Sequence, residues 1–101
     1  MSLPTDPAAR KRIPLYSGLL AYFPDALCEV ARCSQVGNDQ HNPGEPLHWD
    51  RAKSKDEADA LMRHLLDHAT GAPIDTDGIP HLAKAAWRAL ALLQKATEAG
   101  K

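Results

Sequence analysis

The chain has 101 residues and carries 12 Lys and Arg against 13 Asp and Glu, which gives a formal net charge of -1 with His neutral. Because binding to a polyanion by bulk charge needs an excess of positive charge, this balance argues against a nucleic-acid-binding protein. Hydrophobic residues make up 44% of the chain and charged residues 25%, which disfavours both a disordered chain and a membrane span of about 20 apolar residues. We therefore expect one small, soluble domain.

The first 14 residues predict an extended arm ahead of a single helical domain over residues 15–101. Pro4 and Pro7 interrupt the arm, and its basic run lacks the apolar block of a secretory signal, so we expect a cytoplasmic protein. The short apolar patch at residues 15–23 is expected to pack onto the body.

A first helix is predicted over residues 24–36. Pro24 suits the first helical position, where its missing N–H costs nothing, and Gly37 supplies a C-terminal stop. The apolar residues at helical spacing are Ala26, Leu27, Val30 and Ala31. Cys28 and Cys33 are five residues apart on this helix and point about 140° away from each other, so they cannot form a local disulfide.

Residues 37–51 predict a long loop, because Gly, Pro, Asn and Asp residues are frequent there. Loops longer than about 12 to 15 residues in a compact domain are usually functional or disordered. This loop carries His41, His48, Trp49 and Arg51, which favours a functional loop.

Two further helices complete the predicted fold. The second begins at the capping box Ser54-Lys55-Asp56-Glu57 and ends at Gly71, and the third begins near Pro80, where Asp77 could cap it. Their apolar positions are Ala58, Leu61, Met62, Leu65, Leu66 and Ala69 in the second, and Leu82, Ala85, Ala86, Ala89, Leu90, Leu92, Leu93 and Ala96 in the third. No alternating strand pattern of useful length appears. The sequence therefore predicts an all-α class, a small bundle of about three main helices with a long His/Trp loop, which an oligomer would complete.

Ionisable residues border the predicted apolar faces. The apolar face of the second helix centres near Leu65 and Ala69, and one edge of it holds Glu57, Leu61, His64 and His68. Hard divalent cations prefer carboxylate oxygens, imidazole suits Mn²⁺ better than Mg²⁺, and bundles commonly build metal sites from facing helices. The candidate metal ligands along this seam are Glu29, Glu57, His64, Asp67, His68, Asp75, Asp77 and His81.

Each of these assignments has a structural alternative. Two histidines at i, i+4 beside an apolar stripe more often pack and form surface hydrogen bonds, and Asp75 and Asp77 are also ordinary turn residues. Trp49 could stack on a base or close the loop onto the core. Basic residues that could contact phosphates, or could simply be solvated, are Arg51, Arg63, Lys84 and Arg88.

The order of segments resembles the phage and bacterial dATP/dGTP diphosphohydrolase N-terminal domain family, which is similar to the MazG-like all-α nucleotide pyrophosphohydrolases. The resemblance runs from about Leu15 to Leu93. The matching pieces are Phe23-Pro24-Asp25-Ala26-Leu27-Cys28-Glu29-Val30-Ala31, the loop ending in His48-Trp49, Arg63-His64-Leu65-Leu66, and Asp75-x-Asp77-Gly78-Ile79-Pro80-His81-Leu82-Ala83 followed by Ala85-Ala86-Trp87.

The resemblance implies hydrolysis of a (deoxy)purine nucleoside triphosphate to the monophosphate and pyrophosphate with Mg²⁺ or Mn²⁺. It also implies a homodimer or homotetramer, in the host cytoplasm if the protein is phage-encoded, without membrane or nucleic-acid partners. Glu29, His64 and His81 are the expected catalytic residues. The expected metal ligands are Glu29, His64, Asp67, Asp75 and His81, and the expected substrate-binding residues are His48, Trp49, Arg51, Arg63 and Lys84.

One departure from the broader MazG-like superfamily is visible in the sequence. Its Glu-Glu-x-x-Glu and Glu-x-x-Asp sets are absent as such, and His64-x-x-Asp67 is the nearest counterpart of the second. The alternative hypothesis is therefore a non-enzymatic helical interaction or accessory protein with a degenerate site. A DNA-binding helix-turn-helix is disfavoured, because the third helix is rich in Ala and offers few basic residues to a duplex.

Overall fold

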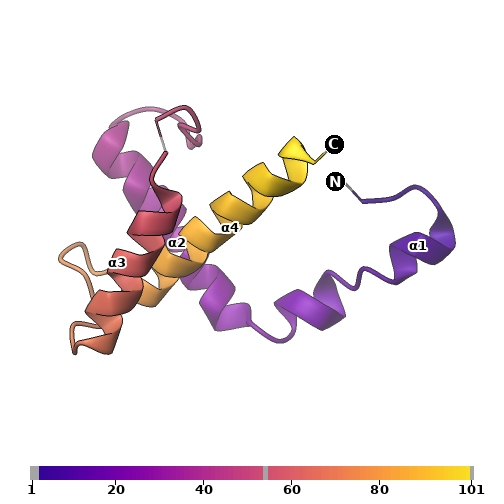
Figure 1. The fold of residues 1–101 in the computed structure, drawn as a ribbon, viewed down its shortest axis with the longest axis horizontal. Coiled ribbons are helices and arrows are strands. Elements are labelled where there is room, and N and C mark those ends of the chain that lie inside the picture. Colours follow the sequence, from indigo (N-terminus) through magenta and orange to yellow (C-terminus); the bar gives the residue numbers. More distant parts are fainter. Residues whose placement is uncertain (1–2, 54, 101) are drawn as a thin grey trace.

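The computed structural model describes residues 3–53 and 55–100. Its elements, in chain order, are α1 (Pro7–Lys11), a single turn of π-helix η1 (Tyr16–Leu20), α2 (Pro24–His41), α3 (Glu57–Ala69) and α4 (His81–Ala99) (Figure 1). Within the described residues, the extended pairing is limited to an isolated bridge between Ile74 and Pro80. The predicted all-α class is thus confirmed. No helix in the part of the chain that the structure describes is long and apolar enough to cross a membrane.

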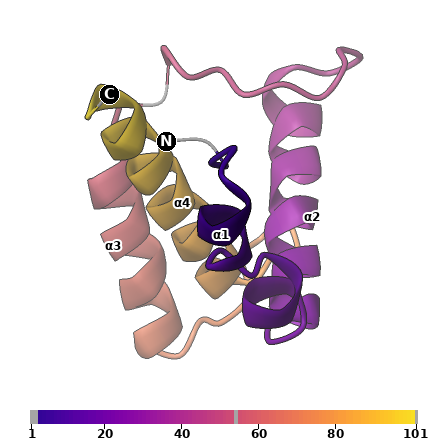
Figure 2. The same ribbon diagram turned by 90° about the vertical axis from the view of Figure 1, so that its right-hand side faces the viewer.

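The three long helices form the body of the molecule. α4 packs against α3 along one side and against α2 along another, and it lies between them in Figure 2. The loop after α2 crosses from the end of that helix towards α3 (Figure 2). The buried apolar core is small and consists of Ala60, Ile79, Ala83, Ala85 and Ala91. Alanine at these positions lets the helix backbones approach closely, but it buries little apolar area.

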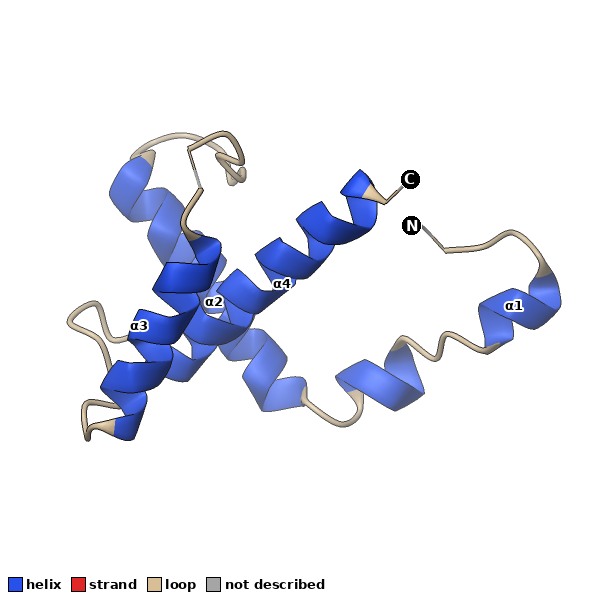
Figure 3. Ribbon diagram, viewed as in Figure 1, coloured by secondary structure: helices blue, strands red, loops and turns tan. Residues whose placement is uncertain are grey.

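The N-terminal segment differs from the prediction of an extended arm over residues 1–14 followed by an apolar patch, residues 15–23, that packs onto the body. Residues 7–11 form a short helix because Asp6 caps it, its carboxylate accepting the Ala9 N–H at 2.9 Å. The apolar patch that follows does not pack onto the body: Tyr16 is 72% exposed and Tyr22 is 70% exposed. Figure 3 shows this segment running to one side of the three long helices.

The prediction that the first long helix ends at Gly37 is wrong, because α2 continues to His41. Gly37 is absent from the glycines with positive φ, so it does not adopt the left-handed conformation of a helix stop. The next residue, Asn38, is buried and holds the following loop: its Nδ2 donates to the Glu45 carbonyl at 3.0 Å, and its Oδ1 accepts from the His48 N–H. The loop therefore begins at Asn42, five residues later than predicted. Both cysteines of this helix are free.

The caps of the other two helices also differ from the prediction. Ser54 lies outside the described residues, and the N-cap position of α3 is Asp56. Pro80 is the N-cap residue of α4, and Asp77 instead accepts the Ile79 N–H at 3.0 Å within the preceding turn.

The buried faces of α3 and α4 are rotated from those predicted, and of the predicted apolar positions only Ala85 is buried. On α3 the buried positions are Glu57 and Ala60, whereas the predicted centre at Leu65 and Ala69 is exposed. On α4 the buried positions are His81, Ala83, Ala85 and Ala91, and the predicted stripe through Leu82, Leu90 and Leu93 faces outward. Hydrophobicity alone misplaced these faces, because the chain buries its small residues and leaves the large apolar ones exposed.

Candidate metal centre and adjoining cavity

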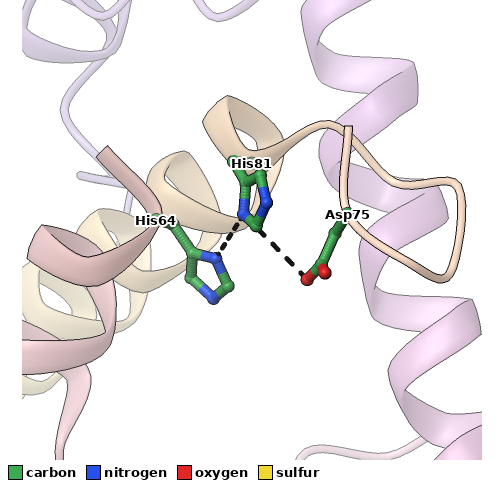
Figure 4. Close-up of side chains that lie close together, drawn as sticks. All are labelled: His64, Asp75 and His81. Carbon is green, nitrogen blue, oxygen red and sulfur yellow. Dashed lines mark hydrogen bonds and ion pairs between the residues drawn. The ribbon is translucent and has the colours of Figure 1, made fainter. Parts of the chain in front are cut away.

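Three predicted ligands converge at one point between α3 and α4. His64 comes from α3, His81 is the first residue of α4, and Asp75 comes from the segment that joins them (Figure 4). Each offers one ligand atom, and these atoms all lie within 4.8 Å of one another. The two imidazoles are closest, with 2.9 Å between their Nδ1 atoms.

The segment between α3 and α4 folds back so that Asp75 approaches His81. The Asp75 N–H donates to the Ile79 carbonyl at 2.9 Å, and the His81 N–H donates to the Pro73 carbonyl at 2.9 Å. Gly78 permits this tight turn because its φ is +82°, a conformation that other residues rarely adopt. The turn therefore fixes a carboxylate 4.0 Å from the His81 imidazole.

The protonation states of this cluster suit metal binding. Burial, assisted by the neighbouring His81, lowers the pKa of His64, so its imidazole is neutral at pH 7. The hydrogen bond from Lys84 is the main reason why the pKa of Asp75 falls to about 2, so its carboxylate is ionised. A neutral imidazole and an ionised carboxylate are the forms that bind metals.

The donor set fits Mn²⁺ better than Mg²⁺. An ion held by both imidazoles needs their nitrogens close together, and the Nδ1 atoms of His64 and His81 already lie 2.9 Å apart. Mg²⁺ prefers an all-oxygen octahedron, whereas imidazole with carboxylate suits Mn²⁺ and other borderline ions.

Lys84 supplies the positive charge of the cluster. Its Nζ lies 2.5 Å from Asp75 Oδ2 and 2.7 Å from Asp77 Oδ2, and it is largely buried between them. These two carboxylates raise the pKa of Lys84 against the opposing effect of burial, which is the largest single contribution. A metal bound to Asp75 would therefore compete with this ammonium group.

The remaining predicted ligands lie at varying positions around the cluster. Asp67 places Oδ2 3.8 Å from His81 Nδ1 and is half-exposed. Glu29 instead pairs with Arg32 at 2.9 Å. Glu57 is 3% exposed and binds two basic side chains of α4, and His68 is exposed in the last turn of α3. The structure thus brings together His64, Asp75 and His81, with Asp67 at the margin, and leaves Glu29, Glu57 and His68 out of the three-residue cluster.

A cavity of about 700 Å³ adjoins the cluster, and His64, Asp77 and Lys84 line it. Its walls come from α2, the loop after α2, the N-cap and the middle of α3, the turn before α4 and the first half of α4. The other lining residues are Cys33, Ser34, Gly37, Asn38, Gln40, His41, Asn42, Leu47, His48, Trp49, Asp50, Lys53, Asp56, Trp87 and Arg88.

The predicted substrate-binding residues divide between this cavity and other surfaces. His48, Trp49 and Lys84 line the cavity. Arg51 lies over the Trp49 ring, 4.4 Å from its centroid, and forms an ion pair with Glu98. Arg63 is not among the lining residues and binds Asp56 at 3.0 Å.

Trp49 closes the loop onto the body, one of the two roles that the sequence left open. Its ring meets Trp87 edge to face, with 5.6 Å between centroids. Its Nε1 is buried, and no hydrogen-bond partner is found for it among the described residues. The Trp87 Nε1 donates to the Ser34 hydroxyl at 2.7 Å, which ties α4 to α2.

Several cavity residues are not predicted as site residues by the sequence, and Asn38 and Trp87 are the two that the structure makes most informative. Asn38 lies beyond the predicted end of its helix, so no signal marked it as a buried anchor of the loop. Trp87 carries no site signal in the sequence, and only its place one turn after Ala83 on α4 indicates the inner face.

Comparisons with known proteins identify the family. A family model described as dATP/dGTP diphosphohydrolase, N-terminal, matches residues 6–101. No match was found among curated proteins or among solved structures. Because the match extends over nearly the whole chain and agrees with the resemblance seen in the sequence, the protein belongs to the dATP/dGTP diphosphohydrolase N-terminal family.

Proposed function

We propose that the protein is a metal-dependent pyrophosphohydrolase of (deoxy)purine nucleoside triphosphates. In this reaction a water oxygen bonds to the α-phosphorus, and the bond from that phosphorus to the bridging oxygen of the β-phosphate breaks. The products are the nucleoside monophosphate and pyrophosphate. The observation that carries the proposal is the convergence of His64, Asp75 and His81 beside a cavity of nucleotide size whose lining includes Lys84 and Arg88.

The cavity has the size that a nucleotide needs, and its lining includes cationic side chains. A volume of about 700 Å³ falls within the range of about 300 to 1,000 Å³ that is usual for small-molecule sites. Lys84 and Arg88 line it on the side of the cluster and could bind phosphate oxygens by charge-assisted hydrogen bonds. Trp49 and Trp87 supply apolar surface for the rest of the ligand.

His64, Asp75 and His81 would hold the metal. A bound Mn²⁺ neutralises phosphate charge and lowers the pKa of a bound water, which is the chemistry that hydrolysis at neutral pH requires. The three side chains orient the ion, and the turn at Gly78 keeps the carboxylate beside the two imidazoles.

The test is pyrophosphate release from dATP, dGTP, dCTP, dTTP, ATP and GTP with Mn²⁺ or Mg²⁺, with EDTA as control and chromatography to identify the monophosphate. We expect metal-dependent turnover of a purine triphosphate, faster with Mn²⁺. His64→Ala should abolish it, while His68→Ala, four residues away on the same helix but exposed, should not. A folded sample that converts no triphosphate with either metal would refute the proposal.

A further inference from the structure

A buried carboxylate and two cations form a charge network beside the cavity. Glu57, the first residue of α3, is 3% exposed. Its Oε1 accepts from Arg88 Nη1 at 3.1 Å, and its Oε2 accepts from Lys95 Nζ at 2.8 Å. Arg88 lines the cavity, whereas Glu57 and Lys95 are not among its lining residues. Of these three side chains, Arg88 is therefore the one that a ligand in the cavity can contact.

Two contacts orient the guanidinium of Arg88. One is the hydrogen bond to Glu57. The other is the Trp87 ring, whose centroid lies 5.5 Å from Arg88 Cζ, within the range of about 6 Å for a cation–π contact. A guanidinium is a planar, rigid fork of N–H donors, so fixing one edge fixes the direction of the rest. The side chain of Arg88 remains 29% exposed.

The two cations of α4 that line the cavity differ in their charge balance. Lys84 and Arg88 are four residues apart, so they share one face of the helix. Lys84 Nζ is bound by two carboxylates of the preceding turn, at 2.5 and 2.7 Å, which together exceed its charge. Glu57 is a single carboxylate shared by Arg88 and Lys95, and it can balance only one of their two charges. An anion in the cavity is therefore attracted more strongly to Arg88 than to Lys84.

The charge of Arg88 also acts on the metal centre. Burial is the main cause of the lowered pKa of His64, and Arg88 is one of the neighbouring cations that lower it further. The guanidinium thus lies close enough to the cluster for the two to bind different phosphates of one triphosphate.

We propose that Arg88 binds the phosphate chain of the substrate and that the buried Glu57 is its positioning residue. The guanidinium forms charge-assisted hydrogen bonds with phosphate oxygens away from the metal. Glu57 does not touch the ligand, and its effect passes through Arg88. The inference rests on the proposed function, since its ligand is the triphosphate part of the same substrate. It assigns to Glu57 a role beyond its contribution to stability.

The first experiment measures binding of inorganic tripolyphosphate to the metal-free full chain in EDTA by isothermal titration calorimetry. This probe carries the phosphate chain without base or sugar, and its binding needs no turnover. Arg88→Met should weaken binding by about 10-fold or more, because a hydrogen bond between charged groups is lost. Arg88→Lys keeps the charge but not the fork, so its loss should be smaller. Unchanged affinity in Arg88→Met, or no binding to the unmodified protein, would overturn the proposal.

Glu57→Gln tests the positioning role, because charge and position predict opposite results. Removal of the carboxylate makes the site more positive, which by itself would tighten the binding of an anion. If the carboxylate aims Arg88, tripolyphosphate binding should instead weaken by about 5-fold or more, since the freed side chain regains rotamers that binding must then remove. Equal or tighter binding by a folded Glu57→Gln protein would refute the positioning role.

Two controls separate this effect from a general disturbance of the fold. Lys95→Met removes the other partner of the same carboxylate and should change the affinity less than Glu57→Gln. In a chain that already carries Arg88→Met, Glu57→Gln should cause no further loss, because the residue through which it acts is gone. A further loss of the same size would show that Glu57 acts independently of Arg88, contrary to the proposal.

A measurement on the unmodified protein covers the case in which Glu57→Gln fails to fold. In isotope-labelled protein, the NMR signals of the Arg88 guanidinium are identified by their absence from Arg88→Lys. Slow rotation about the Nε–Cζ bond should give separate signals for the two Nη atoms, and added tripolyphosphate should shift them. Fast rotation before the anion is added would exclude a guanidinium held in place by Glu57.

Steady-state kinetics distinguish failure of this inference from failure of the proposed function. With a purine triphosphate that is turned over, Arg88→Lys and Glu57→Gln should raise KM with little change in kcat, as expected when a contact is made equally in the ground and transition states. Turnover with an unchanged KM in both would refute the inference and leave the proposed function standing. Tripolyphosphate binding through Arg88 without turnover of any triphosphate would refute the proposed reaction and leave the anion site standing.

Discussion

The Nδ1 atoms of His64 and His81 lie 2.9 Å apart, although their side chains come from different helices. At this distance one imidazole must carry the proton on Nδ1 and donate it to the unprotonated Nδ1 of the other. A metal that binds both nitrogens needs both of them unprotonated, so binding would move the remaining proton to Nε2. The same pair can thus form a hydrogen bond without metal and a chelate with it.

Replacing either histidine of this pair should remove the metal site without unfolding the protein. Titration of Mn²⁺ followed by electron paramagnetic resonance should show at least about a 10-fold loss of affinity for His64→Ala or His81→Ala, because one of three ligands is gone. His68→Ala is the matched control, and its affinity should match that of the unmodified protein. Equal Mn²⁺ affinity in all four proteins would exclude the cluster as a metal site.

The lowered pKa of His64 predicts acid sensitivity of the metal-free protein. Because burial depresses this pKa below the ordinary 6.5, the unfolded chain binds the proton more readily than the folded one. The contribution of His64 to the free energy of unfolding is therefore complete above about pH 6.5 and is lost as the pH falls through its lowered pKa.

Urea unfolding in EDTA at pH 7.5, 6.5 and 5.5, at one protein concentration, tests this. His64→Gln should lose less stability than the unmodified protein between pH 6.5 and 5.5. His48 titrates in the opposite sense, since the carbonyl of Pro46 raises its pKa, but it is present in both proteins and cancels in the comparison. Parallel pH profiles would contradict the prediction.

Lys84 should act as a competitor of the metal. With Lys84→Met, Asp75 loses the hydrogen bond that is the main cause of its pKa of about 2, so this pKa should rise towards 3.8. Carboxyl-carbon NMR titration measures the change directly. Mn²⁺ should bind more tightly to the variant because no ammonium group occupies the carboxylates, whereas Lys55→Met, at an exposed position, should alter neither value. Weaker Mn²⁺ binding in Lys84→Met would show that the lysine supports the site.

Glu57 should be the charged residue of α3 that matters most for stability. Its carboxylate is 3% exposed and accepts from Arg88 at 3.1 Å and from Lys95 at 2.8 Å. Glu57→Ala should lower the free energy of unfolding by about 3 kcal/mol, the lower end of the range for a broken buried ion pair, because both cations are partly exposed and can reach water. Asp59→Ala, two residues on and exposed, should cost much less in chemical denaturation.

The sequence was enough to predict the class and the three main helices, and it included His64, Asp75 and His81 among its candidate ligands, because periodicity and turn chemistry are local properties. The inner faces of α3 and α4 were not predictable in the same way. Hydrophobicity placed Leu65 and Leu90 inward, but these faces are turned outward in the single chain. A hydrophobic stripe predicts that a helix face packs against another surface. It does not predict whether that surface belongs to the same chain.

The position of Asn38 shows a second limit of prediction from local sequence. Its role depends on hydrogen bonds to residues 45 and 48, which a helix assignment from local sequence cannot see. A helix that stops at Gly37 would put the buried Asn38 in the loop. Tertiary contacts with the loop and with α4 outweigh the weak local preference of one glycine.

Two glycine substitutions test directly whether α2 continues past Gly37. Gly37 lies inside the helix without a positive φ, and an added Cβ would meet nothing within 4 Å. Gly37→Ala should therefore raise the free energy of unfolding by about 0.5 to 1 kcal/mol, because alanine favours helix and loses less conformational freedom on folding. Gly78 also has open space around it, but its φ is +82°, so Gly78→Ala should lower stability by about 1 kcal/mol or more.

Comparing the two variants tests the effect of backbone conformation alone, because the added methyl group meets no neighbour within 4 Å in either variant. Urea unfolding of both variants and of the unmodified protein gives the sign of each change in the free energy of unfolding. If the helix instead stopped at Gly37 in the left-handed conformation, Gly37→Ala would destabilise the protein as Gly78→Ala does. Opposite signs require that α2 continue past Gly37, which places Asn38 on the helix and sets where the cavity-lining loop begins.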